Sequence, residues 1–164
     1  METHEFQVQR VSFTSQSPFH EVVSRIGEAI GHPDAVSLRN ATARAETYLE
    51  LSELIRRQVG SSGLMEFARF DLGDVLRKQP SGHIGQSLRL IVGNPLIMRK
   101  MVERVPDAGS YAPVTILIDE RPDGVHVSYD RMAGYLATYQ DSEALATAQE
   151  LDAKVEALMQ AAVK

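Results

Sequence analysis

The sequence contains no cysteine, and this absence excludes disulfide bonds, thiolate metal sites, iron–sulfur clusters and cysteine nucleophiles together. A chain without disulfides fits the reducing cytoplasm, where we expect the protein to be. Histidine, another common metal ligand, occurs five times but never as an H-x-x-x-H or H-x-H pair. The sequence therefore predicts neither a metal site nor a cofactor.

Long apolar runs are also missing. The opening METHEFQVQR has no apolar core of the kind that a signal peptide needs, and no later run reaches the length of a membrane-spanning helix. Basic residues are in the minority, with 17 Lys and Arg against 22 Asp and Glu, and the net charge is −5. This balance argues against a general nucleic-acid-binding role. We therefore expect a soluble cytoplasmic protein that binds neither membranes nor nucleic acids.

The apolar fraction of the chain is ordinary, at 43% of 164 residues, and it predicts a single domain over residues 1–164 with its own core. Apolar and polar residues alternate in segments that predict strands at 6–13, 64–72, 87–92, 113–120 and 124–130. Apolar residues at three- and four-residue steps predict helices at 18–30, 35–59, 96–105 and 131–164. The last of these breaks near 140–142, which leaves a C-terminal helix at about 142–163.

Local signals connect these elements. Pro122 and Gly124, in the stretch RPDG, stand where a tight turn between two strands needs them. Ser17 is predicted to cap the first helix, with Pro18 at its first position. Hairpins beside helices predict an α+β fold with a mostly antiparallel sheet and helices packed on one face. The expected order of elements is β-α-(inserted α)-β-β-α-β-β-α.

The step Gly93-Asn94-Pro95, in RLIVGNPLIMRKM, lies between a predicted strand and a predicted helix. Gly93 allows the backbone to turn, Asn94 can cap the helix, and Pro95 suits its first turn. Free N–H groups at the same helix start could instead hold an anion or a carboxylate, although Pro95 removes one donor. The local chemistry favours a corner over a binding site, since caps far outnumber functional anion sites.

Catalytic signatures such as G-x-S-x-G, H-E-x-x-H and G-x-G-x-x-G are absent. The loop PSGHIGQS lacks the Gly-Lys-Ser/Thr ending of a phosphate-binding loop. An enzyme would have to assemble its site through the fold, with Asp71, His83 or Glu120 as acid or base beside the Gly93-Asn94-Pro95 helix start. The sequence leaves catalysis open.

From Leu90 to Tyr139 the chain carries an ordered set of landmarks. A Gly-Asn-Pro step follows an apolar strand, and then come a helix ending near a proline, a proline-led strand, an acidic residue, a turn, a strand ending in tyrosine and a Tyr-Leu helix. This set resembles the family called domain of unknown function 302. The matching positions are Gly93, Asn94, Pro95, Pro106, Pro113, Glu120, Gly124, Tyr129, Tyr135 and Leu136. Residues 5–30 also look like the opening of that family, so the resemblance spans 5–30 and 64–140.

The resemblance implies an α+β fold that commonly assembles as a homodimer, and it implies no activity. Many members carry Asp-His where this chain has Asp71-Leu72, and another branch carries cysteines where Gly93 and Val114 stand. A metal or redox role of those branches therefore does not transfer to this chain. The family's first helix runs almost directly into its second strand, so residues 31–63 are expected to contain an inserted helix, against the sheet or at a subunit contact.

Three functional hypotheses follow. The leading one is a non-catalytic small-ligand-binding or regulatory module that acts as a homodimer. Its candidate ligand-binding residues are Gly93, Asn94, Pro95, Asp71, His83 and Glu120. One alternative is an enzyme of unknown reaction acting on a small anionic substrate. Another is a protein–protein interaction module whose partner docks on the helix at 36–59.

Overall fold

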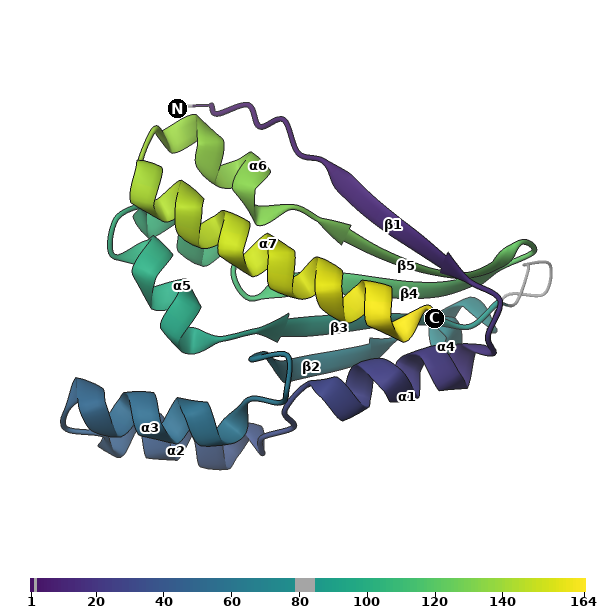
Figure 1. The fold of residues 1–164 in the computed structure, drawn as a ribbon, viewed down its shortest axis with the longest axis horizontal. Coiled ribbons are helices and arrows are strands. Elements are labelled where there is room, and N and C mark those ends of the chain that lie inside the picture. The colour runs from purple at the N-terminus through teal and green to yellow at the C-terminus, as the bar shows by residue number, and fades with distance from the viewer. Residues whose placement is uncertain (2, 79–84) are drawn as a thin grey trace.

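The computed structural model describes residue 1, residues 3–78 and residues 85–164 (Figure 1). The strands in these ranges are β1 (Arg10–Ser15), β2 (Met65–Asp71), β3 (Ser87–Gly93), β4 (Val114–Arg121) and β5 (Gly124–Asp130). The α-helices are α1 (Phe19–Ala29), α2 (Ala35–Arg44), α3 (Tyr48–Gln58), α4 (Leu72–Leu76), α5 (Pro95–Val102), α6 (Met132–Leu136) and α7 (Ser142–Ala162). Short 3-10 helices, η1 (Pro106–Ser110) and η2 (Ala137–Tyr139), complete the set. The predicted α+β fold class is confirmed.

The strands form one antiparallel sheet in the order β1-β5-β4-β3-β2, so β1 and β2 are its edges. The predicted tight turn joins β4 to β5, and Gly124 there has a φ of +135°, which strongly favours glycine. A Cβ at this position would also lie 2.6 Å from the carbonyl oxygen of Ser15 on β1. The glycine is therefore needed both for the turn and for the close approach of β1.

The hydrophobic core lies between the sheet and the helices α1, α5 and α7, which Figure 1 shows on one side of the sheet. In β4 the buried side chains of Val114, Ile116 and Ile118 alternate with partly exposed ones. The predicted C-terminal helix is α7, and its buried seam consists mainly of Ala144, Ala148, Leu151, Val155, Leu158, Met159 and Ala162. The prediction of helices packed on one face is confirmed.

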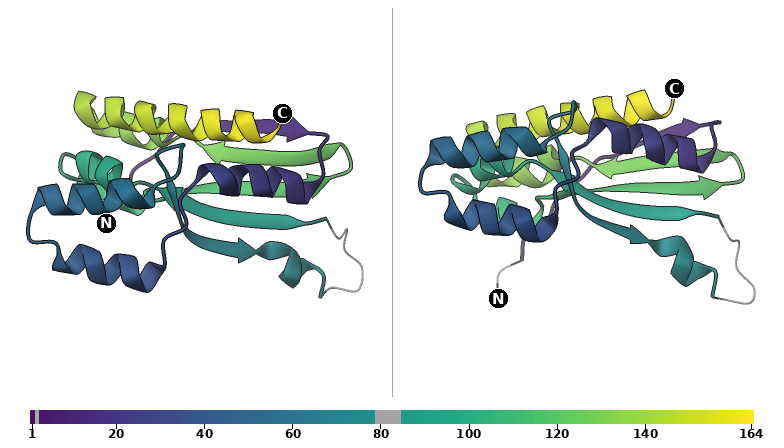
Figure 2. Two further views of the ribbon diagram at one scale, coloured as in Figure 1. Left: turned by 60° about the horizontal axis from the view of Figure 1, so that its bottom comes forward. Right: turned by 90° about the horizontal axis from the view of Figure 1, so that it is seen from below.

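The other face of the sheet is largely open. Figure 2 shows that no helix in the described ranges lies across the centre of this face. Because side chains alternate along a strand, those that lie between the core residues point onto this open face. From β1 and β3 these are Arg10, Arg89 and Ile91, and from β4 and β5 they are Thr115, Leu117, Ser128 and Asp130. This open face carries the candidate site.

The segment predicted as one helix at 35–59 is instead two helices, α2 and α3, with a break at residues 45–47. Asp34 caps α2 by accepting a hydrogen bond from the Ser37 N–H at 2.8 Å, and Thr47 caps α3 by accepting from the Glu50 N–H at 3.2 Å. The apolar periodicity runs through this break and conceals it. The missed signal is Thr47-x-x-Glu50, which has the spacing of a capping box.

Two expectations near the N-terminus are also corrected. The first strand begins at Arg10 rather than at Phe6, because Phe6 packs on an aromatic cluster, with its ring centroid 5.6 Å from that of Tyr111. Pro18 rather than Ser17 occupies the N-cap of α1. The Ser17 hydroxyl instead accepts a hydrogen bond from Arg25 Nη1 at 3.1 Å.

A buried carboxylate ties α6 to α7. Asp152 on α7 is only 5% exposed, and it accepts hydrogen bonds from the Tyr129 hydroxyl at 2.6 Å, the Met132 N–H at 2.7 Å and the Ala133 N–H at 3.1 Å. It therefore caps the start of α6 from a different helix, satisfying two backbone donors there. This contact fixes the end of β5, where the candidate site begins.

Candidate functional site

The Gly93-Asn94-Pro95 step forms the corner between β3 and α5. Asn94 Oδ1 accepts a hydrogen bond from the Leu96 N–H at 2.8 Å, and Asn94 Nδ2 donates one to the Gly63 carbonyl at 2.9 Å. The adjoining cavity holds only about 90 Å³, and apolar groups such as Phe67 dominate its lining. Both polar ends of the Asn94 amide are thus engaged within the protein, and the step has the geometry of a structural corner.

The predicted acidic residues lie near the opposite end of β3. Asp71 pairs with Leu88 and caps α4 by accepting a hydrogen bond from the Asp74 N–H at 3.0 Å. Glu120 accepts one from the Gln86 N–H at 3.3 Å. Since β3 runs from residue 87 to residue 93, these carboxylates lie about 20 Å along the strand from the helix start. The fold therefore does not bring them together with Asn94, and His83 lies outside the described residues.

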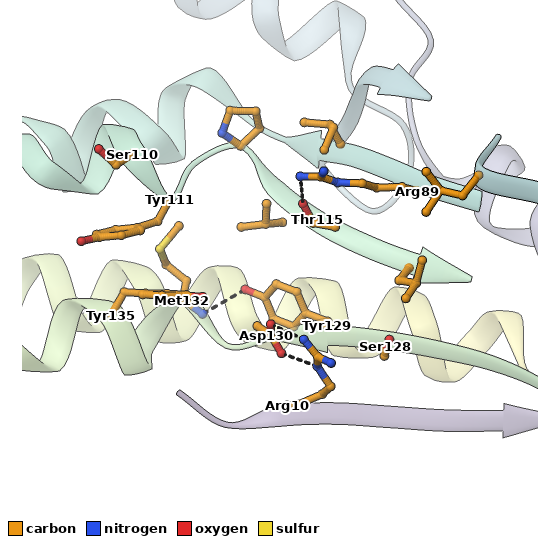
Figure 3. Close-up of a pocket in the computed structure, with 15 residues that line it drawn as sticks. Arg10, Arg89, Ser110, Tyr111, Thr115, Ser128, Tyr129, Asp130, Met132 and Tyr135 are labelled. Carbon is orange, nitrogen blue, oxygen red and sulfur yellow. Dashed lines mark hydrogen bonds and ion pairs between the residues drawn. The ribbon is translucent and has the colours of Figure 1, made fainter. Parts of the chain in front are cut away.

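A groove of about 520 Å³ opens on the uncovered face of the sheet (Figure 3). Its charged lining residues are Arg10, Arg89 and Asp130. Hydroxyl groups come from Ser110, Tyr111, Thr115, Ser128 and Tyr135, and the main apolar contributions come from Leu72, Ile91, Pro113, Leu117 and Met132. Tyr129 also lines the groove, but its hydroxyl is hydrogen-bonded to the buried Asp152. We call this set the open-face groove. This groove was not predicted from the sequence, although polar residues that alternate with the core residues of the predicted strands are among those that line it.

One wall of the open-face groove is an ion pair between edge strand β1 and its neighbour β5. Arg10 and Asp130 are cross-strand partners, and Arg10 donates from Nε and from Nη2 to the two carboxylate oxygens, each at 2.7 Å. This paired hydrogen bonding, together with the positive charge, holds the pKa of Asp130 below its usual range. Asp130 is therefore a carboxylate at neutral pH, and it fixes the Arg10 guanidinium over β5.

Arg89 reaches over the groove from the other side. Its Nη2 donates to the Thr115 hydroxyl on β4 at 3.3 Å, as Figure 3 shows. Within residues 3–78 and 85–164, no carboxylate lies within ion-pair distance of Arg89. Its side-chain hydrogen bond within these residues is to the neutral Thr115 hydroxyl, so no carboxylate there neutralises its charge, which distinguishes it from Arg10. An arginine presented in this way in a concave site can receive an anion.

Aromatic rings close the end of the groove near η1 and α6. The rings of Tyr111 and Tyr135 stack with centroids 4.6 Å apart and planes 12° apart. The Tyr111 hydroxyl lies 3.0 Å from the Tyr139 hydroxyl, which in turn donates to Asp107 at 3.0 Å. Phe6 packs edge-on against Tyr111. This cluster makes a rigid, amphipathic end wall.

The arrangement supplies binding groups rather than a nucleophile with its base. The Thr115 hydroxyl is hydrogen-bonded to a guanidinium, which does not accept a proton at neutral pH. Of the described residues, no cluster of three or more His, Asp and Glu could hold a metal ion. The groove combines positive charge, hydroxyl groups and apolar surface, a composition typical of small-molecule sites.

Fold and site together define an α+β domain with one helix-covered and one open sheet face. The chain belongs to the family described as domain of unknown function DUF302, whose model matches residues 40–162. This confirms the resemblance drawn from the sequence. The matched region begins within α2, contains α3 and ends in the last turn of α7.

Solved structures show the same fold. The crystal structure of an uncharacterized conserved DUF302 protein from Bacillus stearothermophilus is similar to this chain with a TM-score of 0.65, at 10% sequence identity. The likeness covers 93% of this chain and 97% of that one. No curated protein matches the chain. Among the residues that the structure describes, no helix is long and apolar enough to cross a membrane.

Proposed function

We propose that the protein is a cytoplasmic, non-catalytic homodimer that binds a small anionic ligand in the open-face groove. One observation carries this proposal. Arg89 extends into a groove of about 520 Å³ and makes its hydrogen bond there to a hydroxyl, not to a carboxylate. A guanidinium held in a concave, partly apolar site attracts anions more strongly than one on a flat surface.

The state of Asp130 favours binding over acid–base catalysis. A general acid or base works best with a pKa near the working pH. Arg10 instead lowers the pKa of Asp130, by hydrogen bonding and by its positive charge, and so moves it away from neutral pH. The only carboxylate among the groove's lining residues is thus committed to positioning Arg10. Ligand recognition is therefore the role that the lining of this groove supports best.

Binding of the fluorescent anion anilinonaphthalene sulfonate tests the proposal. We expect saturable binding by the native protein and a loss of about tenfold in affinity for Arg89→Gln, because that variant removes the uncompensated charge without much change in shape. Fluorescence titration measures both. Circular dichroism of each protein shows that the dye reports on folded protein.

Arg57→Gln is the matched control, since Arg57 is an exposed arginine on α3, outside the groove. This variant makes the same change in net charge and should bind the dye as the native protein does. Equal binding by Arg89→Gln and native protein would contradict the proposed site.

The homodimer is proposed to form over an exposed apolar surface of β2 and α4. Its residues, which we call the β2–α4 patch, are Phe67, Phe70, Leu72, Val75 and Leu76. β2 is an edge strand, and its outer side is bridged at Met65 by Gly31. A second copy can pair with the rest of that edge about a two-fold axis, because an antiparallel strand pair is self-complementary. Leu72 also lines the open-face groove, so such a contact would adjoin the ligand.

Sedimentation velocity at micromolar concentration tests the dimer. We expect the native protein to have twice the mass of one chain. Val75→Lys should raise the dissociation constant at least about tenfold, because it places a charge in the apolar contact. Val36→Lys, at a similarly exposed apolar position on α2, is the control and should remain dimeric. A native protein with the mass of one chain would contradict the dimer. If Val36→Lys dissociated the dimer and Val75→Lys did not, the contact would lie on the helix pair α2–α3 and not on the β2–α4 patch.

A further inference from the structure

The two arginines of the open-face groove approach each other from opposite edges of the site. Arg10 extends from β1 over β5 to Asp130, and Arg89 extends from β3 over β4 to Thr115 (Figure 3). Ile116 pairs with Tyr129, and Thr115 and Asp130 are the next residues of β4 and β5 beyond this pair. The side chains that anchor the two guanidinium groups are therefore adjacent on the sheet.

Most donors of these two arginines remain available to a ligand. A guanidinium has five N–H donors. Arg10 uses its Nε and Nη2 on Asp130, and Arg89 uses Nη2 on Thr115. The Ser128 hydroxyl also lines the groove, on the same face of the sheet. A planar group with two acceptor oxygens can bind the fork of Arg89 with two parallel hydrogen bonds.

The charge of the lining limits the charge of the ligand. Arg10 and Asp130 neutralise each other, and Arg89 leaves one positive charge. A singly charged group makes the site neutral. A phosphate dianion would instead leave one excess negative charge close to the Asp130 carboxylate, which costs free energy in a partly desolvated site.

The remaining walls suit an apolar body. Leu117 on β4 pairs with Arg89, and Ile91 lies two residues further along β3 on the same face. Leu72 lies at the start of α4, and the stacked Tyr111 and Tyr135 close the far end. A volume of about 520 Å³ is within the range of small-molecule sites and exceeds the needs of a bare inorganic ion. The anion is therefore expected to be part of a larger molecule.

We infer that the ligand is a monocarboxylate with an apolar body, whose carboxylate binds Arg89 beside Arg10 and whose body packs on Leu117, Ile91 and the tyrosine pair. This inference rests on the proposed function and specifies the chemical class of the ligand. The Arg89 fork recognises the carboxylate, Arg10 adds a second donor, and Asp130 discriminates against dianions. Specificity thus depends on a repulsive charge as well as on an attractive one.

Displacement of anilinonaphthalene sulfonate by four small molecules tests this inference. The molecules are phenylacetate, its neutral analogue phenylacetamide, the dianion phenyl phosphate, and acetate, which has no apolar body. At pH 8 we expect phenylacetate to displace the dye at a concentration at least about tenfold lower than any of the other three. Arg89→Gln should remove the preference for phenylacetate over phenylacetamide, and Arg57→Gln should retain it.

Each outcome has a distinct meaning. Displacement by phenyl phosphate at the same or a lower concentration than phenylacetate would overturn the monocarboxylate and leave the proposed anion site in place. Equal displacement by acetate would overturn the apolar body. Equal dye binding by Arg89→Gln and native protein would overturn the proposed function itself.

Discussion

Asp152→Ala is expected to lower the free energy of unfolding by about 3 to 5 kcal/mol. The variant leaves the Met132 and Ala133 N–H groups and the Tyr129 hydroxyl without the carboxylate that accepts their hydrogen bonds. Tyr129 is buried at the end of β5, so water cannot readily replace that acceptor. The loss should be visible as a lower urea midpoint with little change in slope.

Related variants separate the hydrogen bonds from the helix itself. Tyr129→Phe removes one donor and keeps the carboxylate, so we expect a loss of only about 1 kcal/mol. Glu150→Ala changes an exposed carboxylate on the same helix and should alter stability by less than about 0.5 kcal/mol. An Asp152→Ala loss no larger than that of Glu150→Ala would show that α6 is held by other contacts.

The same carboxylate gives this prediction a dependence on pH. Burial raises the pKa of Asp152 above its ordinary value, and the hydrogen bonds from Tyr129, Ala133 and Met132 only partly oppose the rise. The folded state therefore holds this proton more tightly than the unfolded state, and ionisation of Asp152 disfavours folding. Relative to Asp152→Asn, which does not ionise, the native protein should lose stability as pH rises from about 4 through the raised pKa. Urea titrations of both proteins across this range measure the difference, and a constant or widening advantage of the native protein would contradict the direction of the shift.

Gly31→Ala is expected to destabilise the protein by about 3 kcal/mol or more. A Cβ at Gly31 would lie 1.7 Å from the carbonyl oxygen of Gln58, at the end of α3. Gly31 also donates its N–H to the Leu64 carbonyl at 2.9 Å and accepts from the Glu66 N–H at 2.8 Å. Because the three nearest atoms are all backbone, no side-chain rotation can relieve the clash, and the junction of α1, α3 and β2 has to open.

Gly27→Ala provides the control in the neighbouring helix. A Cβ at Gly27 would meet nothing closer than His32 Nε2 at 3.8 Å, and its position inside α1 favours alanine. This variant should be neutral or stabilising by up to about 1 kcal/mol. Thermal unfolding of both variants is the measurement. Similar stability of Gly31→Ala and native protein would show that the α2–α3 hairpin can shift without cost.

Much of the fold could be predicted because its signals are local. The alternation in β4 and the turn at Gly124 each depend on residues close together in the chain. The break between α2 and α3 was missed because the apolar periodicity continues through it. The cap at Thr47, which marks the start of α3, was the weaker of the two local signals. α2 has no buried residue, so the apolar residues in its sequence do not mark a face that packs on the core.

The candidate site was harder to predict because it depends on pairing between distant strands. Asn94, Asp71 and Glu120 stood out in the sequence, yet each side chain accepts a hydrogen bond from a backbone N–H of the same domain. Asn94 also lies at the opposite end of β3 from the two carboxylates. Arg10 and Arg89 stood out less, because an isolated arginine on a strand is common. Their significance arises only when β1 and β3 flank β5 and β4 in one sheet.

The sequence by itself determined the family, the α+β class and most element boundaries. These properties follow from side-chain periodicity, caps and turns, which act over a few residues. The tertiary structure alone decided that Arg10 is neutralised by a residue 120 positions away, while Arg89 meets no carboxylate in the part of the chain that the structure describes. Charge balance depends on distances between side chains in space, and only the strand order and register set those distances.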